Sequence, residues 1–465
     1  MNIRVTEENV IGVQDLGAAS ELTADFIASV NLALDQNETA EAIGLAQSLH
    51  YADLADLLEN LAHAQREELV EALRNDFDPN ILAELDDSIR ERVIDQLGIR
   101  HVAEAIAELE TDDALEVVEE LDADERLEIL EALPASERTF IEQGLSYPED
   151  SAGRLMQREA VAVPSHWTVG QAIDFLRDTE NLPTEFYDIF LVDPAHNPVG
   201  TVPLSRVLRA KRAVELTGIM RKHIKIVPVD MDQEEVAFLF RQRDLTSAPV
   251  VDRDDRLVGV ITVDDIVDVI YEENEEDIMR LAGVGEEDDL YSAVIDTMKS
   301  RFTWLLIHLG AAIIAAYVIS FFAGTIEEMV ALAILMPIVA AMGGTASVQT
   351  LTVAVRAIAM KELTMSNAYR TIGKEVAVGV LNGIIFAVLI GAVTWAWFGS
   401  PALGGVIGLA IVINLIVAGF VGSALPILLQ RMGFDPAVAS SAFLTSITDV
   451  VGFYVFLGLA ASLLL

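Results

Sequence analysis

Asp449 is the first candidate for a functional residue in this sequence, because no other residue between Pro436 and Leu465 carries a charge. An apolar stretch of this length can cross a bilayer at about 1.5 Å per residue. An ionisable group at membrane depth is costly, so it usually faces a water-filled path or a partner. We therefore predict an ion or proton site at Asp449. A structural hydrogen bond between helices is the alternative.

A second group of carboxylates precedes the apolar part of the chain. It comprises Asp264, Asp265, Asp268, Glu272, Glu273, Glu275, Glu276 and Asp277. Like charges at helical spacing repel one another. Hard divalent cations, which prefer oxygen ligands, would relieve that repulsion. The pattern thus favours cation binding, with a solvated charged helix as the alternative.

The last third of the chain is predicted to form five transmembrane helices. The apolar runs are Phe302–Ala323, Met329–Val355, Val376–Phe398, Ala402–Leu429 and Pro436–Leu465. Basic residues lie before the first run, between the second and third, and between the fourth and fifth. The positive-inside rule then places residues 1–300 in the cytoplasm and the C-terminus outside. We expect a multi-pass protein of the plasma (inner) membrane.

Acidic charge is confined to the part before these runs. The chain carries 30 basic and 73 acidic residues, and residues 301–465 hold six of each, so the net charge of −43 belongs to residues 1–300. Such a field repels nucleic acid and attracts cations. General solubility or adaptation to a high-salt habitat is the alternative. The absence of cysteine excludes thiolate metal sites. With no His-Glu-x-x-His or Walker A motif, we expect no enzyme.

Residues 1–146 are predicted to form a helical, α-solenoid-like domain. Glycine and proline are nearly absent from about Glu21 to Gln143, and leucine and alanine recur at helical spacing with acidic outer faces. Two acidic motifs have the composition of helix N-termini, Thr111-Asp112-Asp113 and Asp122-Ala123-Asp124. The expected helical segments are Leu54–Leu73, Ile81–Leu97, Val102–Leu121 and Arg126–Leu133.

An internal repeat of alternating strands and helices follows. The first copy has a leader Leu155-Met156, strands Ala160–Pro164, Ile189–Val192 and Pro198–Val202, and helices Val169–Arg177 and Leu204–Leu208. The second has a leader Ile219-Met220, strands Ile226–Val229, Ala248–Val251 and Leu257–Ile261, and helices Glu234–Gln242 and Val263–Ile270. This order resembles the CBS domain pair, an α/β regulatory module that often binds adenosyl nucleotides. The copies are placed at 147–215 and 216–274. No residue of a phosphate cradle is identified, and ATP binding stays open.

Four motifs in chain order carry a further resemblance. They are Tyr147–Met156 (YPEDSAGRLM); Met336–Gly344 (MPIVAAMGG) with Gln349, Thr350 and Arg356; Asn414 with Pro426; and Asp435-Pro436-Ala437 with Thr445–Asp449 and Gly452. Together they make the chain similar to the MgtE family of magnesium channels along nearly its whole length. The domain order is the family's own: a helical domain, a CBS pair, a linker (plug-type) helix at 275–300 and a five-helix membrane domain at 301–465.

The resemblance implies a homodimer in membrane lipid, with a pore on its two-fold axis and Asp449 engaging hydrated Mg²⁺. Mg²⁺ loses water reluctantly, so a wide site with few carboxylates suits it. Pro337 and the glycine pair are expected to break the second apolar helix and expose carbonyls. Close packing by small residues is the alternative. The pore residues are then Asp449, Thr448, Thr445, Gly343, Gly344, Thr345 and Asn414.

The resemblance also implies that cytoplasmic Mg²⁺ closes the channel by bridging acidic surfaces of the helical domain, the CBS pair and the linker. The metal-binding candidates, besides Asp449, are Asp265, Asp268, Glu273, Glu276, Asp277 and Asp113. Thr345 stands where the family usually has asparagine, which bears on ion selectivity and flux. The function expected is Mg²⁺ influx gated by Mg²⁺. A CBS-regulated channel or transporter for Mn²⁺, Co²⁺, Ni²⁺ or another solute is the alternative.

Overall fold

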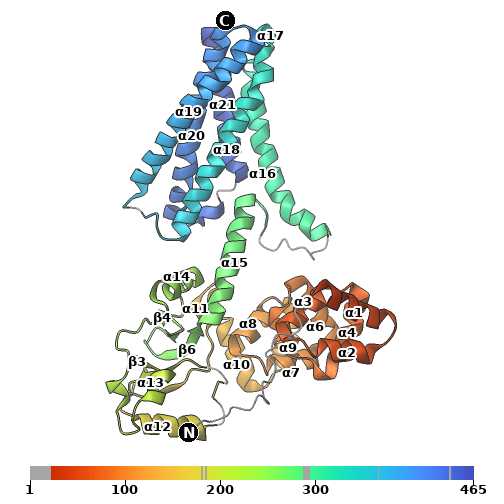
Figure 1. The fold of residues 1–465 in the computed structure, drawn as a ribbon, viewed down its shortest axis with the longest axis vertical. Helices are drawn as coiled ribbons and strands as arrows, with labels where there is room; N and C mark the ends of the chain where they lie inside the picture. The colour runs from red at the N-terminus through yellow and green to blue at the C-terminus, as the bar shows by residue number, and fades with distance from the viewer. Residues whose placement is uncertain (1–21, 180–181, 184–185, 286–293, 365, 439–440) are drawn as a thin grey trace, which may run out of the picture. The chain divides into compact units, whose positions relative to one another are not determined.

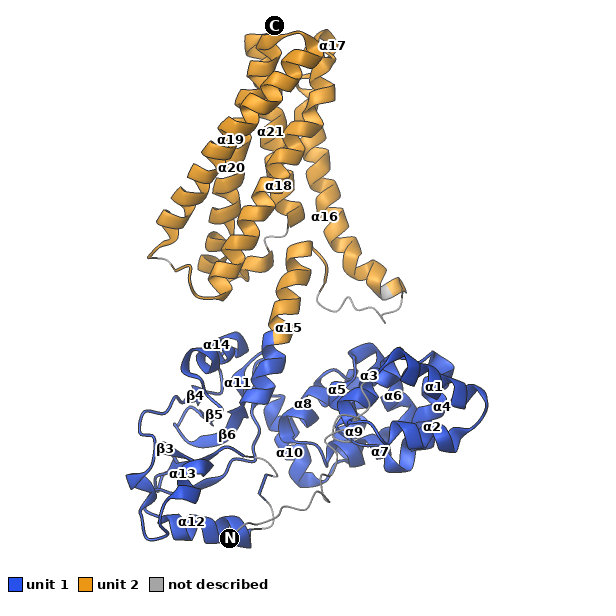
Figure 2. Cartoon of the chain, in the orientation of Figure 1, with its two compact units in different colours: residues 1–270 blue, residues 271–465 orange. Residues whose placement is uncertain are grey.

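The computed structural model describes residues 22–179, 182–183, 186–285, 294–364, 366–438 and 441–465. The chain divides into two compact units, residues 1–270 and 271–465 (Figure 2). The boundary falls inside one long helix, α15 (Val263–Ala282). The predicted linker segment 275–300 therefore contains the end of α15 and, after a stretch outside the described residues, the start of the next helix.

The first unit begins with the predicted helical domain, a series of short helices stacked on their neighbours (Figure 1). Its elements are α1 (Ala24–Asp35), α2 (Thr39–Ala46), α3 (Tyr51–Asn60), α4 (His63–Leu73), η1 (Arg74–Asp76), α5 (Ile81–Glu84), α6 (Asp87–Leu97), α7 (Ile99–Ile106), α8 (Thr111–Glu119), α9 (Ala123–Ala132) and α10 (Ala135–Gly144). The helix starts predicted at Thr111 and Asp122 are confirmed, with α8 beginning at Thr111 and Asp122 preceding α9.

Arginine side chains hydrogen-bond to backbone carbonyls where one helix ends and the next begins, at connections that we call the arginine joints. Arg66 donates from Nε to the carbonyl of Leu58 at 2.7 Å and from Nη2 to that of Leu61 at 3.1 Å. Arg126 donates in the same way to the carbonyl of Leu121 at 3.0 Å. A guanidinium thus satisfies carbonyls that a helix end leaves unpaired. The spacing recurs at Leu61/Arg66, Leu85/Arg90, Leu121/Arg126 and Leu133/Arg138.

These joints overturn the predicted helix lengths. Leu54–Leu73 was expected as one helical segment, but it contains the end of α3 and all of α4, with Leu61 in extended conformation between them. Ile81–Leu97 likewise forms α5 and α6, and Val102–Leu121 spans α7 and α8. The break between α3 and α4 contains no glycine or proline. The carbonyls at the end of α3 are instead satisfied by the guanidinium of Arg66.

The repeat forms two three-stranded sheets of identical topology, in which the first and second strands are parallel and the second and third antiparallel. The first copy comprises α11 (Ala152–Leu155), β1 (Ala162–Pro164), α12 (Val169–Asp178), β2 (Asp188–Val192), β3 (Pro198–Pro203), α13 (Leu204–Arg209) and η2 (Leu216–Gly218). The second comprises β4 (Val227–Pro228), α14 (Gln233–Arg243), β5 (Ser247–Val251), β6 (Leu257–Thr262) and α15. The predicted strands and helices are confirmed, and the last helix is much longer than expected.

The leader of each copy packs on the other copy. Gln157 pairs with Val260 of β6, while Arg221 pairs with Thr201 of β3. A glycine makes room at each crossing, since a Cβ added at Gly259 would lie 2.9 Å from the Sδ of Met156. The two sequence-contiguous copies are thus interlocked, and residues 147–157 belong to the core of the second copy.

The second unit is a bundle of long apolar helices. Its elements after α15 are α16 (Val294–Ser320), α17 (Ala323–Glu328), α18 (Ala331–Ala359), α19 (Ala368–Phe398), α20 (Pro401–Met432), η3 (Pro436–Val438) and α21 (Ser441–Leu463). Among the described residues, five helices are long and apolar enough to span a membrane, as predicted. The last predicted run is not one helix, because η3 precedes α21.

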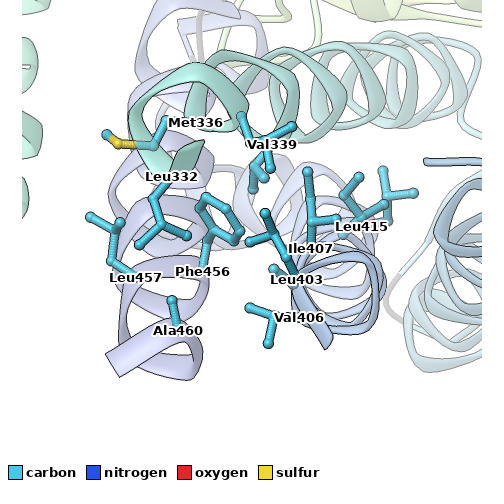
Figure 3. Close-up of a cluster of buried hydrophobic side chains, with 13 residues drawn as sticks. Leu332, Met336, Val339, Leu403, Val406, Ile407, Leu415, Phe456, Leu457 and Ala460 are labelled. Carbon is cyan, nitrogen blue, oxygen red and sulfur yellow. The ribbon is translucent and has the colours of Figure 1, made fainter. Parts of the chain in front are cut away.

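Side chains from α18, α20 and α21 meet in the core of this unit, with Phe456 and Ile407 fully buried (Figure 3). The helix α18 continues from Ala331 to Ala359 through Pro337 and the glycine pair. The predicted break in this helix is therefore wrong. Gly343 and Gly344 instead allow close contacts with the neighbouring helices, as small residues commonly do in membranes.

The helices α19 and α20 approach one another along small residues. A Cβ added at Gly379 would lie 2.5 Å from the carbonyl oxygen of Leu415, and one added at Gly404 would lie 2.6 Å from that of Gly391. Glycines at 379, 383 and 391 recur at multiples of four residues, so they share one face of α19. Backbone-to-backbone packing therefore holds this helix pair together.

Candidate functional site

Asp449 lies on α21, the helix that packs against α16, α18 and α20. Its side chain is partly buried. One helical turn before it, the Oγ of Ser446 lies 3.5 Å from the Nδ1 of His308 on α16. The imidazole is also within electrostatic range of the Asp449 carboxylate. A carboxylate, a hydroxyl and an imidazole from two spanning helices thus lie in one region of the membrane domain.

The two predicted threonines share this helix but use their hydroxyl hydrogens locally. Thr445 donates to the carbonyl of Ala442 at 3.0 Å, and Thr448 donates to the carbonyl of Thr445 at 2.9 Å. Thr448 is fully buried in the single chain, whereas Thr445 is partly exposed. Their oxygens keep lone pairs, so Thr445 is the better placed of the two to face an ion.

Asn414 on α20 lies between two other helices. Its Nδ2 donates to the carbonyl of Val339 on α18 at 3.0 Å, and its Oδ1 is buried with no hydrogen-bond partner among the described residues. A Cβ added at Gly343 would lie 2.2 Å from this Nδ2, and one added at Gly452 would lie 2.7 Å from it. A buried amide oxygen without a donor is the kind of group that a water or cation satisfies.

The predicted residues on α18 face different ways. Gly343 and Gly344 are buried, and Gly344 packs on Thr445. Thr345 is exposed in the single chain, as is Gln349 one turn later. The structure therefore brings the glycine pair together with Asn414 and Thr445. It leaves Thr345 on the opposite, exposed stripe of the helix.

In the first unit, α8 and α15 bring carboxylates together. Asp265 accepts from the backbone nitrogen of Thr262 at 3.1 Å and from its hydroxyl at 2.9 Å. The carboxylate of Asp112 lies close to it, with an Oδ1 that is buried and has no hydrogen-bond partner among the described residues. Burial, then repulsion by Asp265, raises the pKa of Asp112 well above its usual range. Burial, then repulsion by Glu116, raises the pKa of Asp113 to about 7.

The cluster extends to a third helix. Burial, then repulsion by Asp268, raises the pKa of Glu84 on α5. Asp268 also repels Glu116, whose pKa is raised by burial although Arg90 opposes the shift. We call Glu84, Asp112, Asp113, Glu116, Asp265 and Asp268 the acidic cluster. Its members resist being charged together, which is the electrostatic condition that a bound cation relieves.

Sequence reasoning selected Asp113, Asp265 and Asp268 but missed Asp112, Glu84 and Glu116. The sequence around Asp112 predicts only the start of a helix, because no local pattern shows that α15 packs against it. Within the described residues, no three His, Asp or Glu side chains are arranged to hold one metal ion directly.

The remaining predicted acids lie in the second unit, at the end of α15. Glu276 and Asp435 both form ion pairs with Arg280. Burial, then repulsion by Asp435, raises the pKa of Asp277. Glu273 is partly exposed two turns before Arg280. The predicted metal residues in the soluble part and linker thus divide into two groups, one in each compact unit.

Known families match three parts of the chain. Residues 336–459 match a family of divalent cation transporters, residues 49–150 match the MgtE intracellular N domain, and residues 216–272 match the CBS domain. The chain is 35% identical over 327 residues to the magnesium transporter MgtE of Thermus thermophilus, covering 70% of this chain and 72% of that protein.

A second relative and a solved structure are similar to the same chain. The magnesium transporter MgtE of Bacillus subtilis is 30% identical over 318 residues, covering 68% of this chain and 70% of that protein. A solved structure of the cytosolic domain of the Mg²⁺ channel MgtE in complex with ATP is 31% identical, with a TM-score of 0.48, covering 52% of this chain and 99% of that one. From the identity and coverage of the full-length relatives, the chain belongs to the MgtE family of divalent cation transporters.

Proposed function

We propose that this chain conducts Mg²⁺ into the cell through a pore in which Asp449 engages the hydrated ion. The observation that carries the proposal is the position of Asp449 on α21, the helix in contact with three other spanning helices. The related proteins of T. thermophilus and B. subtilis are named as magnesium transporters. An ionisable group is retained at membrane depth where it serves an ion path.

The pore is proposed to lie between two copies of the chain. One aspartate from each copy would place two negative charges opposite a dication. Thr345 and Gln349, exposed on α18 in the single chain, would then line the path or the contact between the copies. The orphan Oδ1 of Asn414 and the hydroxyl oxygen of Thr445 add neutral oxygens, which suit an ion that keeps its water.

The orientation proposed has the first unit in the cytoplasm and Leu465 outside, in the plasma membrane. The support is the distribution of basic residues, which flank alternate ends of the five spans. Influx then means passage from the C-terminal side of α21 toward its N-terminal end, in the direction that a negative-inside potential favours.

Mg²⁺ is proposed to close the pore by binding to the acidic cluster. Burial and mutual repulsion raise the pKa values of Asp112 and Asp113, so the packed arrangement of α8 against α15 disfavours charged carboxylates. Bound cations would offset that repulsion. The closed state is favoured only if it binds Mg²⁺ more tightly than the open state does. Glu273, Glu276 and Asp277 would supply further weak sites on α15.

The test is ion uptake by the purified full chain in liposomes. Uptake of Mg²⁺ is compared with uptake of Mn²⁺, chloride and a neutral osmolyte, using a dye or isotope specific for each. Mg²⁺ flux that, at a fixed inward Mg²⁺ gradient, falls as Mg²⁺ on the side of the acidic cluster rises would support both parts of the proposal. Flux of chloride or osmolyte without Mg²⁺ flux would contradict it and favour another CBS-regulated transporter.

A nucleotide is a second ligand to test on the CBS pair. Asp188 of β2 is buried and accepts at Oδ2 from the hydroxyl of Ser247 at 2.9 Å and from that of Thr246 at 3.3 Å. Its Oδ1 has no hydrogen-bond partner among the described residues, and a ribose hydroxyl would supply one. ATP should then raise the melting temperature of the chain, and Asp188→Asn should reduce the rise.

A further inference from the structure

His308 brings a nitrogen donor to a membrane domain whose other candidate ligands are oxygens. It lies near the middle of the span Thr297–Ser320 and its side chain is exposed in the single chain. It is the one histidine in residues 301–465. An ionisable side chain at this depth usually faces protein or a water-filled path rather than lipid. Its surroundings therefore decide what it does.

The contact with α21 leaves one ring nitrogen available. The hydroxyl of Ser446 donates to the carbonyl of Ala442 at 2.8 Å, so its hydrogen is committed to its own helix. The contact of 3.5 Å between Ser446 Oγ and the imidazole involves Nδ1, so Nε2 is the ring nitrogen that this contact leaves unengaged. Neutral imidazole can bind a metal ion through Nε2. Ser446 lies three residues before Asp449, so both share one face of α21.

We propose that Nε2 of His308, with the carboxylate of Asp449, makes the ion path a mixed nitrogen and oxygen site that holds Co²⁺ and Ni²⁺ more tightly than Mg²⁺ or Mn²⁺. The inference rests on the proposed function, in which Asp449 lies in the ion path. Mg²⁺ and Mn²⁺ prefer oxygen ligands, whereas imidazole favours the later first-row metals. Two protein ligands leave the other positions to water, so such ions are slowed rather than held permanently.

A purely structural role for His308 is the competing account. In that role the imidazole ties α16 to α21 through Ser446, and the identity of the nitrogen donor does not affect which metals block the pore. A glutamine preserves a polar contact to Ser446 but is a poor ligand for Ni²⁺. Metal selectivity, rather than folding or total flux, therefore separates the two accounts.

The experiment measures block of Mg²⁺ influx in liposomes that contain the full chain and a Mg²⁺-sensitive dye. For each variant, the external concentrations of Ni²⁺, Co²⁺ and Mn²⁺ that halve its own Mg²⁺ influx are determined. We expect Ni²⁺ and Co²⁺ to block the unsubstituted chain at concentrations about tenfold or more below that of Mn²⁺. His308→Gln should bring the Ni²⁺ and Mn²⁺ values within about threefold of each other. His223→Gln makes the same chemical change at an exposed position of the CBS pair and should keep the original ratio.

The deciding quantity is the ratio of the half-blocking concentration of Mn²⁺ to that of Ni²⁺. Two results would overturn the inference: a ratio near one in the unsubstituted chain, or an unchanged ratio in His308→Gln. If His308→Gln does not give a monodisperse protein, His308→Asn replaces it. Asp449→Asn separates this inference from the proposed function. Normal Mg²⁺ flux in Asp449→Asn would contradict the pore itself, whereas lost flux there with an unchanged ratio in His308→Gln contradicts only the role of the imidazole.

Discussion

The amide of Asn414 occupies the space that a side chain at Gly343 would need, since a Cβ added there would lie 2.2 Å from Nδ2. The same amide donates to the carbonyl of Val339 at 3.0 Å. Gly343 thus fixes both the approach of α18 to α20 and the direction in which Asn414 Oδ1 points. A change at Gly343 should therefore alter both the packing of α18 against α20 and the position of Asn414 Oδ1 in the proposed ion path.

We expect Gly343→Ala to destabilise the membrane domain by about 1–3 kcal/mol, because the added methyl must displace the Asn414 amide. Thermal unfolding of the detergent-solubilised chain measures this. Gly373→Ala is the matched control, since nothing lies within 4 Å of a Cβ added there. The double variant with Asn414→Ala should lose less stability than the two single changes added together. Full additivity would show that the two residues do not interact as described.

Asp449→Asn should leave a folded chain but remove most Mg²⁺ flux, because a neutral amide cannot compensate a hydrated dication in the membrane. The measurement is initial Mg²⁺ uptake by liposomes containing equal amounts of each protein. Glu328→Gln changes an exposed carboxylate on α17, outside the spans, and serves as the control for loss of one charge in the second unit. Uptake by Asp449→Asn at the rate of the unsubstituted chain would exclude Asp449 from the pore.

The topology can be tested with single cysteines, since the chain contains none. A membrane-impermeant thiol reagent applied to intact cells should label Ser400→Cys, between α19 and α20, but not Lys361→Cys, between α18 and α19. The reason is the confinement of basic residues to alternate loops. Permeabilised cells provide the positive control for Lys361→Cys. The reverse labelling pattern would place the first unit outside and contradict the proposed direction of gating.

Hydrophobic patterning predicted the spans and the strands of the CBS pair, because each is a local property of its own segment. It could not show which segments pack together. The leader around Met156 packs on Gly259, Asp112 meets Asp265, and His308 meets Ser446, each across more than a hundred residues of chain. The arginine joints were readable in principle as a leucine followed five residues later by arginine. Their meaning depends on carbonyls that no sequence motif displays.

Protonation should partly replace Mg²⁺ in the acidic cluster. The pKa of Asp113 is raised to about 7 by burial and by neighbouring acids. A raised carboxyl pKa means that the packed state binds the proton more tightly than the unfolded chain does. Its contribution to stability is therefore full below the ordinary value of about 4 and is lost as pH rises through about 7.

In chelator, the first unit should accordingly melt at a lower temperature at pH 8 than at pH 6. Asp113→Asn should reduce this difference, because the amide cannot ionise. Asp124→Asn replaces an exposed aspartate on α9 and is the matched control. An unchanged difference in Asp113→Asn would show that another group controls the pH response.

Mg²⁺ should compact the cytoplasmic part by neutralising the same carboxylates. The fragment to test is residues 1–282, which contains the first compact unit and all of α15. Its radius of gyration, from small-angle scattering, should fall when Mg²⁺ is added in place of chelator. The effect should be larger at pH 8 than at pH 6, because at pH 6 protons already neutralise part of the cluster and Mg²⁺ must compete with them.

The triple change Asp112→Asn, Asp113→Asn and Asp265→Asn should strongly reduce the dependence on Mg²⁺, because it removes three of the six carboxylates of the acidic cluster and the repulsion between them. The radius of gyration of the triple variant in chelator is informative. If it is as small as that of the unsubstituted fragment with Mg²⁺, repulsion between these carboxylates alone opens the unit. In liposomes, the full chain with the same changes should lose the decline of flux with internal Mg²⁺. If the fragment is equally compact with and without Mg²⁺ before any change, the acidic cluster is not the sensor. If the triple variant still closes at high internal Mg²⁺, then Asp112, Asp113 and Asp265 are not required for sensing, and Glu273, Glu276 and Asp277 on α15 are the next residues to change.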